Sequence, residues 1–157
     1  MPKNVAVIGP GDDAQNRDIE DARTLGRLLA ERGITVVNGG LGGVMASASE
    51  GASSVGGMSI GLLPESSQEN ANQYLSIAIP TGLGELRNGL VITSADAVVA
   101  VGGSWGTLSE IALAKRIGKP IVCLHGWWIE SQEHTPIEIN RVETPEDAVN
   151  WVMMYLS

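Results

Sequence analysis

The segment from Ala97 to Pro120 constrains the fold most strongly, because it joins an apolar strand, a glycine-rich turn and a helix without interruption. Residues 98–101 form a continuous apolar run rich in β-branched side chains, which is typical of a strand covered on both faces in a parallel sheet. The chain then passes through a turn from Gly102 to Gly106, and a helical stretch follows it. This order predicts a strand whose end opens directly into the start of a helix.

The helix after this turn carries start and stop signals. Thr107 and Glu110 are three positions apart, the spacing at which a Thr caps a helix and a Glu reaches back to its amide. Gly118 and Pro120 stand where a left-handed cap residue and a helix breaker belong. A glycine turn that leads into a helix leaves backbone N–H groups free at the positive end of the helix dipole, which suits an anion. We therefore predict a nucleotide or phosphate pocket at this turn.

Strands and helices alternate along the whole chain. A first strand at residues 4–8 is followed by a helix over residues 16–32, whose apolar side chains recur on one face. Further strands are predicted at residues 35–37, 58–63, 74–79, 121–124 and 137–139. Further helices are predicted at residues 44–54, at 85–94 and from Pro145. Residues 64–73 are polar and are predicted to form a surface loop that could act as a lid. The alternation predicts one domain over residues 1–157, an α/β, Rossmann-like, open and mostly parallel sheet with helices on both faces.

Several glycine turns are expected along one rim of this sheet. Right-handed crossovers bring the carboxyl ends of parallel strands to the same edge, so the turns at Gly9, Gly39 and Gly102 and the loop at Thr81 meet there. No turn matches the phosphate-loop pattern or the strict Gly-x-Gly-x-x-Gly fingerprint, and glycines in any single turn are equally well explained by a tight connection. Three turns on one rim favour a ligand site. Its expected binding residues are Gly9, Gly39, Gly40, Gly42, Gly103, Ser104, Trp105, Gly106 and Thr107.

Charge and composition limit the partners. The formal net charge of −8 argues against a nucleic-acid surface, which needs a basic face, but it is compatible with a small anionic ligand in a local pocket. The one cysteine, Cys123, lies in a buried apolar run and can form no internal disulfide or cysteine metal cluster. We predict no metal and no bound cofactor. The chain starts without signal-peptide features and has no run long enough to span a membrane, so we expect a cytoplasmic protein.

Arg87 and Glu110 are the candidate catalytic residues. Arg87 lies in the first turn of a predicted helix, where the dipole disfavours a cation, and a bound anion would remove that conflict. A surface ion pair with Glu85 or Asp96 explains Arg87 equally well. The capping box alone explains Glu110, but the same position directs a carboxylate at the turn, where it could serve as general acid or base. Trp105 could stack on a base or close the wall of the crevice.

Several short sequences between residues 4 and 125 resemble one known family. They are VAVIG at 5–9, LLAERG at 28–33, VNGG at 37–40, GGVM at 42–45, IGLLP at 60–64, Arg87, and GGSWGTLSE at 102–110. Together they resemble the LOG family of cytokinin-activating phosphoribohydrolases and its relatives. That superfamily also holds the DNA-processing protein DprA and molybdenum-cofactor carrier proteins.

The resemblance implies roles for particular residues. Enzymes of the family carry Pro-Gly-Gly-x-Gly-Thr-x-x-Glu after an Arg-Lys pair, and they split a nucleoside 5′-monophosphate into free base and ribose 5-phosphate. Here Gly102 replaces the proline, Ser104 replaces the second glycine, and Asn88 stands in the lysine position. By the resemblance, Arg87 and Glu110 would assist departure of the base and attack of water, and the 5′-phosphate would be held by Gly103, Ser104, Gly106 and Thr107.

Two functions are therefore open. One is a nucleotide-binding protein that hydrolyses the N-glycosidic bond of a nucleoside 5′-monophosphate, which Arg87 and Glu110 favour. The other is a non-catalytic carrier or sensor of a phosphorylated cofactor, of molybdopterin or nucleotide type, which Asn88, Ser104 and the plain loop at 64–73 favour. A structural subunit with a vestigial crevice is a third interpretation. Members of the family usually pair through helices, so the resemblance also implies a homodimer.

Overall fold

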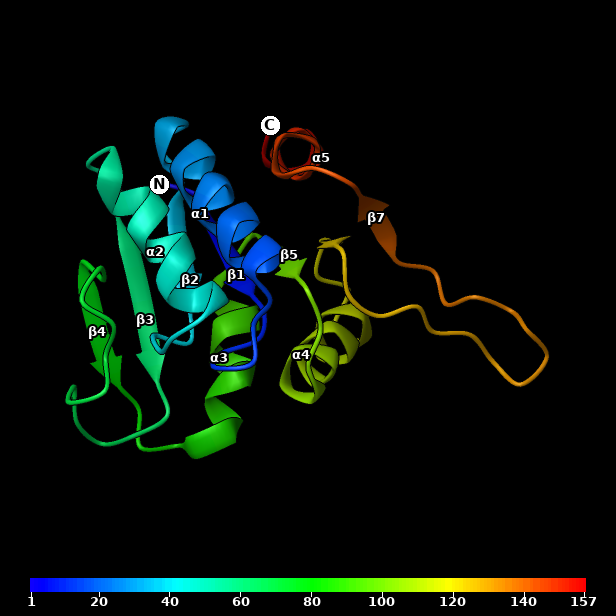
Figure 1. Cartoon of the computed structure of the whole chain (residues 1–157), viewed down its shortest axis with the longest axis horizontal. Helices are drawn as coiled ribbons and strands as arrows, with labels where there is room; N and C mark the ends of the chain where they lie inside the picture. Colours follow the sequence, from blue (N-terminus) through cyan, green and yellow to red (C-terminus); the bar gives the residue numbers. More distant parts are fainter.

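The computed structural model describes all residues from Met1 to Ser157, and its centre is a seven-stranded parallel sheet (Figure 1). The strand order is β4-β3-β2-β1-β5-β6-β7, and every neighbouring pair runs parallel. The α/β, Rossmann-like fold predicted from the sequence is therefore confirmed. The strands are β1 (Asn4–Ile8), β2 (Thr35–Asn38), β3 (Ser59–Leu63), β4 (Ile77–Pro80), β5 (Ala97–Val101), β6 (Ile121–Leu124) and β7 (Asn140–Val142).

Helices cover both faces of the sheet. The helices are α1 (Asn16–Glu31), α2 (Val44–Ser54), α3 (Arg87–Ser94), α4 (Trp105–Arg116) and α5 (Pro145–Leu156), and a 3₁₀ turn, η1 (Gly84–Leu86), leads into α3. One buried core cluster joins α1, α2 and α5 to the sheet, and a second joins α3 and α4 to its other face. None of the helices combines the length and the apolar character that a membrane span requires.

The strand order reverses direction beside β1, and this reversal positions the site. The chain moves outward from β1 through β2, β3 and β4, then crosses over to β5 on the other side of β1. The turns that follow Ile8 and Val101 consequently leave neighbouring strands toward opposite faces. In a doubly wound sheet such a point opens a crevice outside the carboxyl ends of the strands.

Two predicted strands differ from the structure, one in its existence and one in its bounds. The strand expected at 137–139 is wrong, because residues 129–137 fold back on themselves: Ile137 N donates to Ile129 O, and Glu130 pairs with Pro136 in an antiparallel bridge. This arm extends away from the body of the molecule in Figure 1, and the sheet resumes only at β7. The strand expected at 74–79 begins at Ile77, since an Asn72 side chain that accepts from Tyr74 N keeps the chain in a turn.

The helices α1 and α2 pack unusually closely through small residues. A Cβ atom built on Gly26 of α1 would collide with the backbone of Ala48 in α2, and one on Gly51 would collide with the backbone of Arg23. The small-residue helix read from the sequence at 44–54 therefore matches α2, which lets two backbones approach each other. This contact holds the helix that follows the second glycine turn.

We expect Gly26→Ala to destabilise the protein by about 1–3 kcal/mol, because overpacking at the α1–α2 contact outweighs the gain of roughly 1 kcal/mol that Ala brings to a helix. Urea denaturation of both proteins measures the difference. Gly89→Ala in α3 is the matched control: its Cβ would meet only Leu113 at 3.9 Å, so this variant should be as stable as the parent or more stable. Equal effects of the two substitutions would contradict the packing argument.

Candidate functional site

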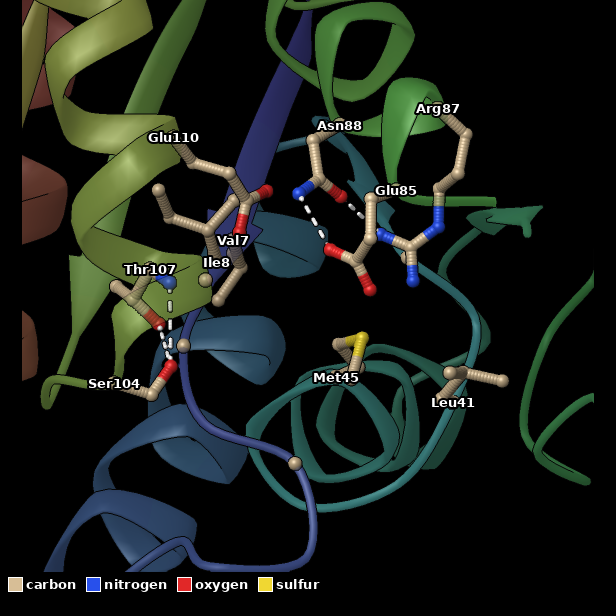
Figure 2. A pocket seen from close by; sticks show the side chains of 14 residues that line it. Val7, Ile8, Leu41, Met45, Glu85, Arg87, Asn88, Ser104, Thr107 and Glu110 are labelled. Atoms are coloured by element: carbon tan, nitrogen blue, oxygen red, sulfur yellow. Dashed lines mark hydrogen bonds between the residues drawn. The ribbon is translucent and has the colours of Figure 1, made fainter. Parts of the chain in front are cut away.

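A cavity of about 200 Å³ opens at the reversal point between β1 and β5. Figure 2 shows side chains entering it from α4 on one side and from η1 and α3 on the other. Four separate stretches of the chain, residues 7–11, 39–45, 85–88 and 104–110, contribute to its wall. The lining residues are Val7, Ile8, Gly9, Gly11, Gly39, Leu41, Met45, Glu85, Arg87, Asn88, Ser104, Gly106, Thr107 and Glu110.

Arg87 is a buried cation at this cavity. Its side chain is 8% exposed, and no carboxylate lies within the 4.0 Å that defines an ion pair. The Nη1 atom donates to the Asn88 side chain at 2.6 Å, whereas Nε is buried without any partner. The surface ion pair weighed from the sequence is wrong, since Asp96 accepts from the Asn4 amide instead. Burial lowers the pKa of the guanidinium, although the charges of Glu110 and Glu85 oppose that change.

The second glycine turn makes room for this guanidinium. A Cβ atom on Gly39 would lie 2.7–2.8 Å from the guanidinium atoms of Arg87, so any larger residue here would displace the guanidinium. The fully buried Asn38 holds the turn, because its Nδ2 donates to Met45 O at 3.1 Å and its Oδ1 accepts from Gly40 N at 2.8 Å. An asparagine directly before the two glycines is the sequence signal that could have identified this support.

The start of α4 differs from the predicted capping box. Ser104, in extended conformation, is the cap: its Oγ accepts from Thr107 N at 3.2 Å. The helix thus begins at Trp105. The glycine turn predicted free amides at this helix start, but the amide of Thr107 is occupied by the Ser104 cap. The Ser104 and Thr107 hydroxyls are 2.9 Å apart, and only one of them can donate to the other. One hydroxyl proton therefore remains for a ligand in the cavity.

Glu110 lies one turn further into α4 than a capping residue would. Its carboxyl group is 9% exposed, lines the cavity and makes no hydrogen bond that would explain it as part of the helix start. Burial raises the pKa of Glu110 to about 7; the charge of Arg87 opposes this rise and that of Glu85 adds to it. The cavity thus holds a carboxyl group that is poised to gain or lose a proton near neutral pH.

Asn88 and Glu85 complete the polar wall. Asn88 accepts from Arg87 and donates to the Glu85 carboxylate at 3.5 Å, as the dashed lines in Figure 2 mark. Asn88 therefore orients the arginine, whereas a lysine at this position would bring a second cation. In this arrangement one cation faces two carboxyl groups, of which Glu110 carries the raised pKa.

The remaining predicted residues fall into two groups. Gly9, Gly39, Ser104, Gly106 and Thr107 line the cavity together with the two catalytic candidates. Gly40, Gly42, Gly103 and Trp105 do not line it. Trp105 is 78% exposed and packs against Trp127, with 5.3 Å between ring centroids.

The apolar floor of the cavity was not predicted. Leu41 and Met45 come from the second turn and from α2, and Val7 and Ile8 come from the end of β1. In the sequence these side chains carry the ordinary pattern of a core, so nothing marks them as lining a site. The expected loop at 64–73 is tied to the same turn, because Asn72 donates to the carbonyl oxygens of Gly40 and Leu41.

Comparison with known sequences identifies relatives of the whole chain. The model of the SLOG cluster4 family matches residues 2–149. An uncharacterized protein of Archaeoglobus fulgidus is 40% identical over 148 residues, which cover 94% of this chain and 92% of that protein. The match therefore extends across all seven strands rather than over one motif.

Solved structures also resemble this chain over nearly its whole length. The molybdenum cofactor binding protein of Rippkaea orientalis is 33% identical with a TM-score of 0.91, over 100% of this chain and 99% of that one. The molybdenum cofactor carrier protein of Chlamydomonas reinhardtii is 30% identical with a TM-score of 0.87, over 99% of both chains. DNA processing protein A of Helicobacter pylori shares the fold. It is 23% identical with a TM-score of 0.74, over 98% of this chain and 81% of that one. The superfamily suspected from the sequence is therefore confirmed.

We expect Glu110→Gln to remove a pH dependence of stability. The folded chain keeps the Glu110 proton up to about pH 7, whereas an ordinary carboxyl with a pKa of 4.5 loses it earlier. This contribution to stability is therefore complete below pH 4.5 and is lost as pH rises through 7. The free energy of unfolding of the variant relative to the parent should rise by about 3 kcal/mol between pH 4.5 and pH 8. Denaturant titrations at both pH values measure this difference in unfolding free energy. Glu133→Gln, at an exposed position, is the control, and its difference from the parent should be the same at both pH values.

Proposed function

The chain belongs to the SLOG cluster4 family, and from this premise we propose that it binds a small phosphorylated ligand as a carrier or sensor. The ligand class is a nucleotide or a molybdopterin-type cofactor. The anionic group of the ligand contacts Arg87 and the Ser104–Thr107 hydroxyl pair, and the rest of the ligand extends along the rim of the sheet. This proposal concerns a ligand that the protein carries, not a group that it uses as a resident cofactor.

One observation supports this proposal above all: the guanidinium of Arg87 is buried at the cavity without an ion-pair partner. Burying a charge without a partner costs free energy, and a guanidinium offers a planar fork that matches phosphate oxygens. A bound phosphate would supply the missing acceptors. Gly39 makes room for that guanidinium, so the turn and the arginine form one arrangement.

The relatives favour a carrier over an enzyme. Two solved proteins at 33% and 30% identity over nearly the whole chain are a molybdenum cofactor binding protein and a molybdenum cofactor carrier protein. Asn88 supports the same choice, since it replaces the lysine expected in the hydrolases of the LOG family. We propose a small-molecule partner rather than nucleic acid, because the net charge of −8 repels a phosphate backbone.

Hydrolysis of a nucleoside 5′-monophosphate is the second candidate function, and Glu110 favours it. A carboxyl group with a pKa of about 7 can donate a proton to a departing base, or as a carboxylate accept one from the attacking water. Water adds to C1′ of the ribose while the C1′–N bond breaks, and the base leaves with the proton. Only cavity residues are needed for these proton transfers.

We expect Arg87→Ala to weaken the binding of AMP by at least about tenfold, because a charged hydrogen-bond pair is lost. Arg87→Lys should recover only part of the affinity, since an ammonium lacks the planar fork. Calorimetric titration measures both, and Arg116→Ala, which removes an exposed charge from the far end of α4, should leave affinity unchanged. Equal affinity in the parent and Arg87→Ala would exclude the proposed anion site.

The same proteins decide between carrier and hydrolase. If the protein is a hydrolase, AMP should yield adenine, and Glu110→Gln should abolish that release while binding is retained. Chromatography of the reaction measures free adenine against a blank without protein. Binding of AMP without any adenine release supports the carrier.

We also propose that the protein forms a homodimer through the outer face of η1 and α3. Leu83, Leu86 and Leu90 recur there at helical spacing and are 45%, 79% and 41% exposed. Exposed apolar side chains that gather on one face mark an interaction surface. Because Leu86 directly precedes Arg87, the second copy would lie beside the cavity.

Leu86→Glu should convert the dimer into a monomer, since a carboxylate would be buried at the contact. Sedimentation velocity at micromolar concentration measures the mass of the species. Met154→Glu, at another exposed apolar side chain on α5, is the control and should leave the mass unchanged. A parent protein that sediments as a monomer would contradict the proposed dimer.

A further inference from the structure

A second cavity, of about 240 Å³, lies on the opposite side of the Gly102–Gly106 turn from the first. The loop after β1, the first turn of α1, the glycine turn itself and the segment after β6 form its wall. Gln15, Asp18, Gly103 and Trp127 are among its lining residues. None of them contacts the first cavity, but the two spaces share the glycine turn and the loop after β1 as a common wall.

Asp18 is the unexplained residue of this second cavity. It is 3% exposed, and its Oδ1 atom is buried without a hydrogen-bond partner. The Nε atom of Arg17 lies 3.8 Å from Oδ1, beyond hydrogen-bond distance. The carboxylate packs against Gly102, whose φ of +70° and missing Cβ leave just enough room for it. An acceptor buried in this way costs free energy until a donor reaches it.

No donor of the chain lies within hydrogen-bond distance of Asp18 Oδ1. Asp21, one turn further along α1, is paired: its Oδ2 atom lies 2.8 Å from His125 Nε2. Asp18 makes no hydrogen bond through Oδ1, and the one cation near it, Arg17, lies 3.8 Å away and lines the same cavity. The residue before α1, Gln15, makes no capping hydrogen bond with its side chain either. The polar groups at this end of α1 are therefore left for something that enters the cavity.

The wall beside Asp18 is flat and firmly held. The Nε1 atom of Trp127 donates to Ser104 O at 3.1 Å, and the ring lies so close to Gly103 that a Cβ there would be 3.0 Å from that nitrogen. Trp105 packs against Trp127, with 5.3 Å between the ring centroids. An indole fixed in this way offers an apolar surface to a flat ring.

The combined size of the two cavities suits one ligand that spans both. Each is smaller than the roughly 300–1,000 Å³ that small-molecule sites usually occupy, and together they reach that range. The first offers the Arg87 guanidinium and hydroxyl groups, and the second offers the Asp18 carboxylate, with Arg17 beside it, and an indole. A ligand with an anionic group at one end and a nitrogen-rich ring at the other matches this division.

We propose that the second cavity is the ring subsite of the phosphorylated ligand, and that Asp18 recognises an amino-lactam edge, the adjacent ring N–H and amino group that guanine and pterin rings share. This inference rests on the proposed function, because it assigns the other end of the same ligand. Two carboxylate oxygens accept the two parallel N–H groups of such an edge. Adenine presents an acceptor nitrogen beside its amino group, and that nitrogen would face the carboxylate and repel it.

The first test compares nucleotides on the unaltered full-length protein. Calorimetric titration at constant salt should show that GMP binds at least about tenfold more tightly than AMP, with IMP, which has the ring N–H but no amino group, between them. Neopterin, which carries the same edge on a pterin ring, is compared with guanosine as a competitor of bound GMP. Stronger competition by neopterin assigns the subsite to pterins, and stronger competition by guanosine assigns it to guanine nucleotides.

The second test changes the recognition chemistry. Asp18→Asn should lose the preference for GMP and instead favour XMP, whose exocyclic C2 carbonyl oxygen replaces the amino group of guanine and accepts from the new amide. A merely structural role for Asp18 would not produce this exchange of preferences. Glu20→Gln, which removes an exposed charge from the same helix, is the matched control and should keep the parent preference.

The outcomes separate the two proposals. If GMP and AMP bind the parent protein equally, the ring subsite is wrong while the proposed phosphate site stands. If neither nucleotide nor inorganic pyrophosphate binds, the proposed function fails and the ring subsite fails with it. The GMP to AMP ratio of the parent decides the inference even if Asp18→Asn does not fold.

Discussion

The arrangement of the site depends on one buried cation, Arg87. Its guanidinium lies against the backbone of Gly39, is oriented by Asn88, and leaves one buried nitrogen without a partner. Glu85 and Glu110 are near enough to influence its charge but form no ion pair with it. Removing a guanidinium from water without an ion-pair partner costs folding free energy. Unfavourable burial of this kind is typical of sites where a bound ligand supplies the missing partner.

Close backbone approaches hold this cation in place. Strand β1 ends between β5 and α2, and helix α2 is drawn onto α1 where Gly26 and Gly51 remove the side chains that would separate them. Asn38 then fixes the second glycine turn from within, through hydrogen bonds to Met45 and Gly40. The wall that faces Arg87 is therefore built from backbone and small residues. Such walls admit a ligand close to the main chain without requiring side chains to move.

The glycine turn after β5 has two sides with different chemistry. On one side Ser104 and Thr107 present hydroxyl groups across the cavity from Arg87, and on the other side Asp18 and Trp127 form a carboxylate and an indole wall. Trp127 donates to the carbonyl oxygen of Ser104, so the two sides are joined through the turn itself. Opposite charges held apart by a rigid turn suit a ligand that is anionic at one end and rich in N–H donors at the other.

The sequence by itself determined the alternation of strands and helices, the shared rim of the glycine turns and the family, because periodicity, turn residues and short motifs are local properties. It placed Thr107 as the helix cap, predicted a strand at 137–139 and left Arg87 as either a surface residue or a ligand contact. Only the tertiary structure decided that Ser104 is the cap, that Arg87 is buried against Gly39, and that Asp18 is buried without a hydrogen bond to Oδ1. Burial and the absence of a partner are set by segments far apart in the chain, and no local pattern records which of them will meet.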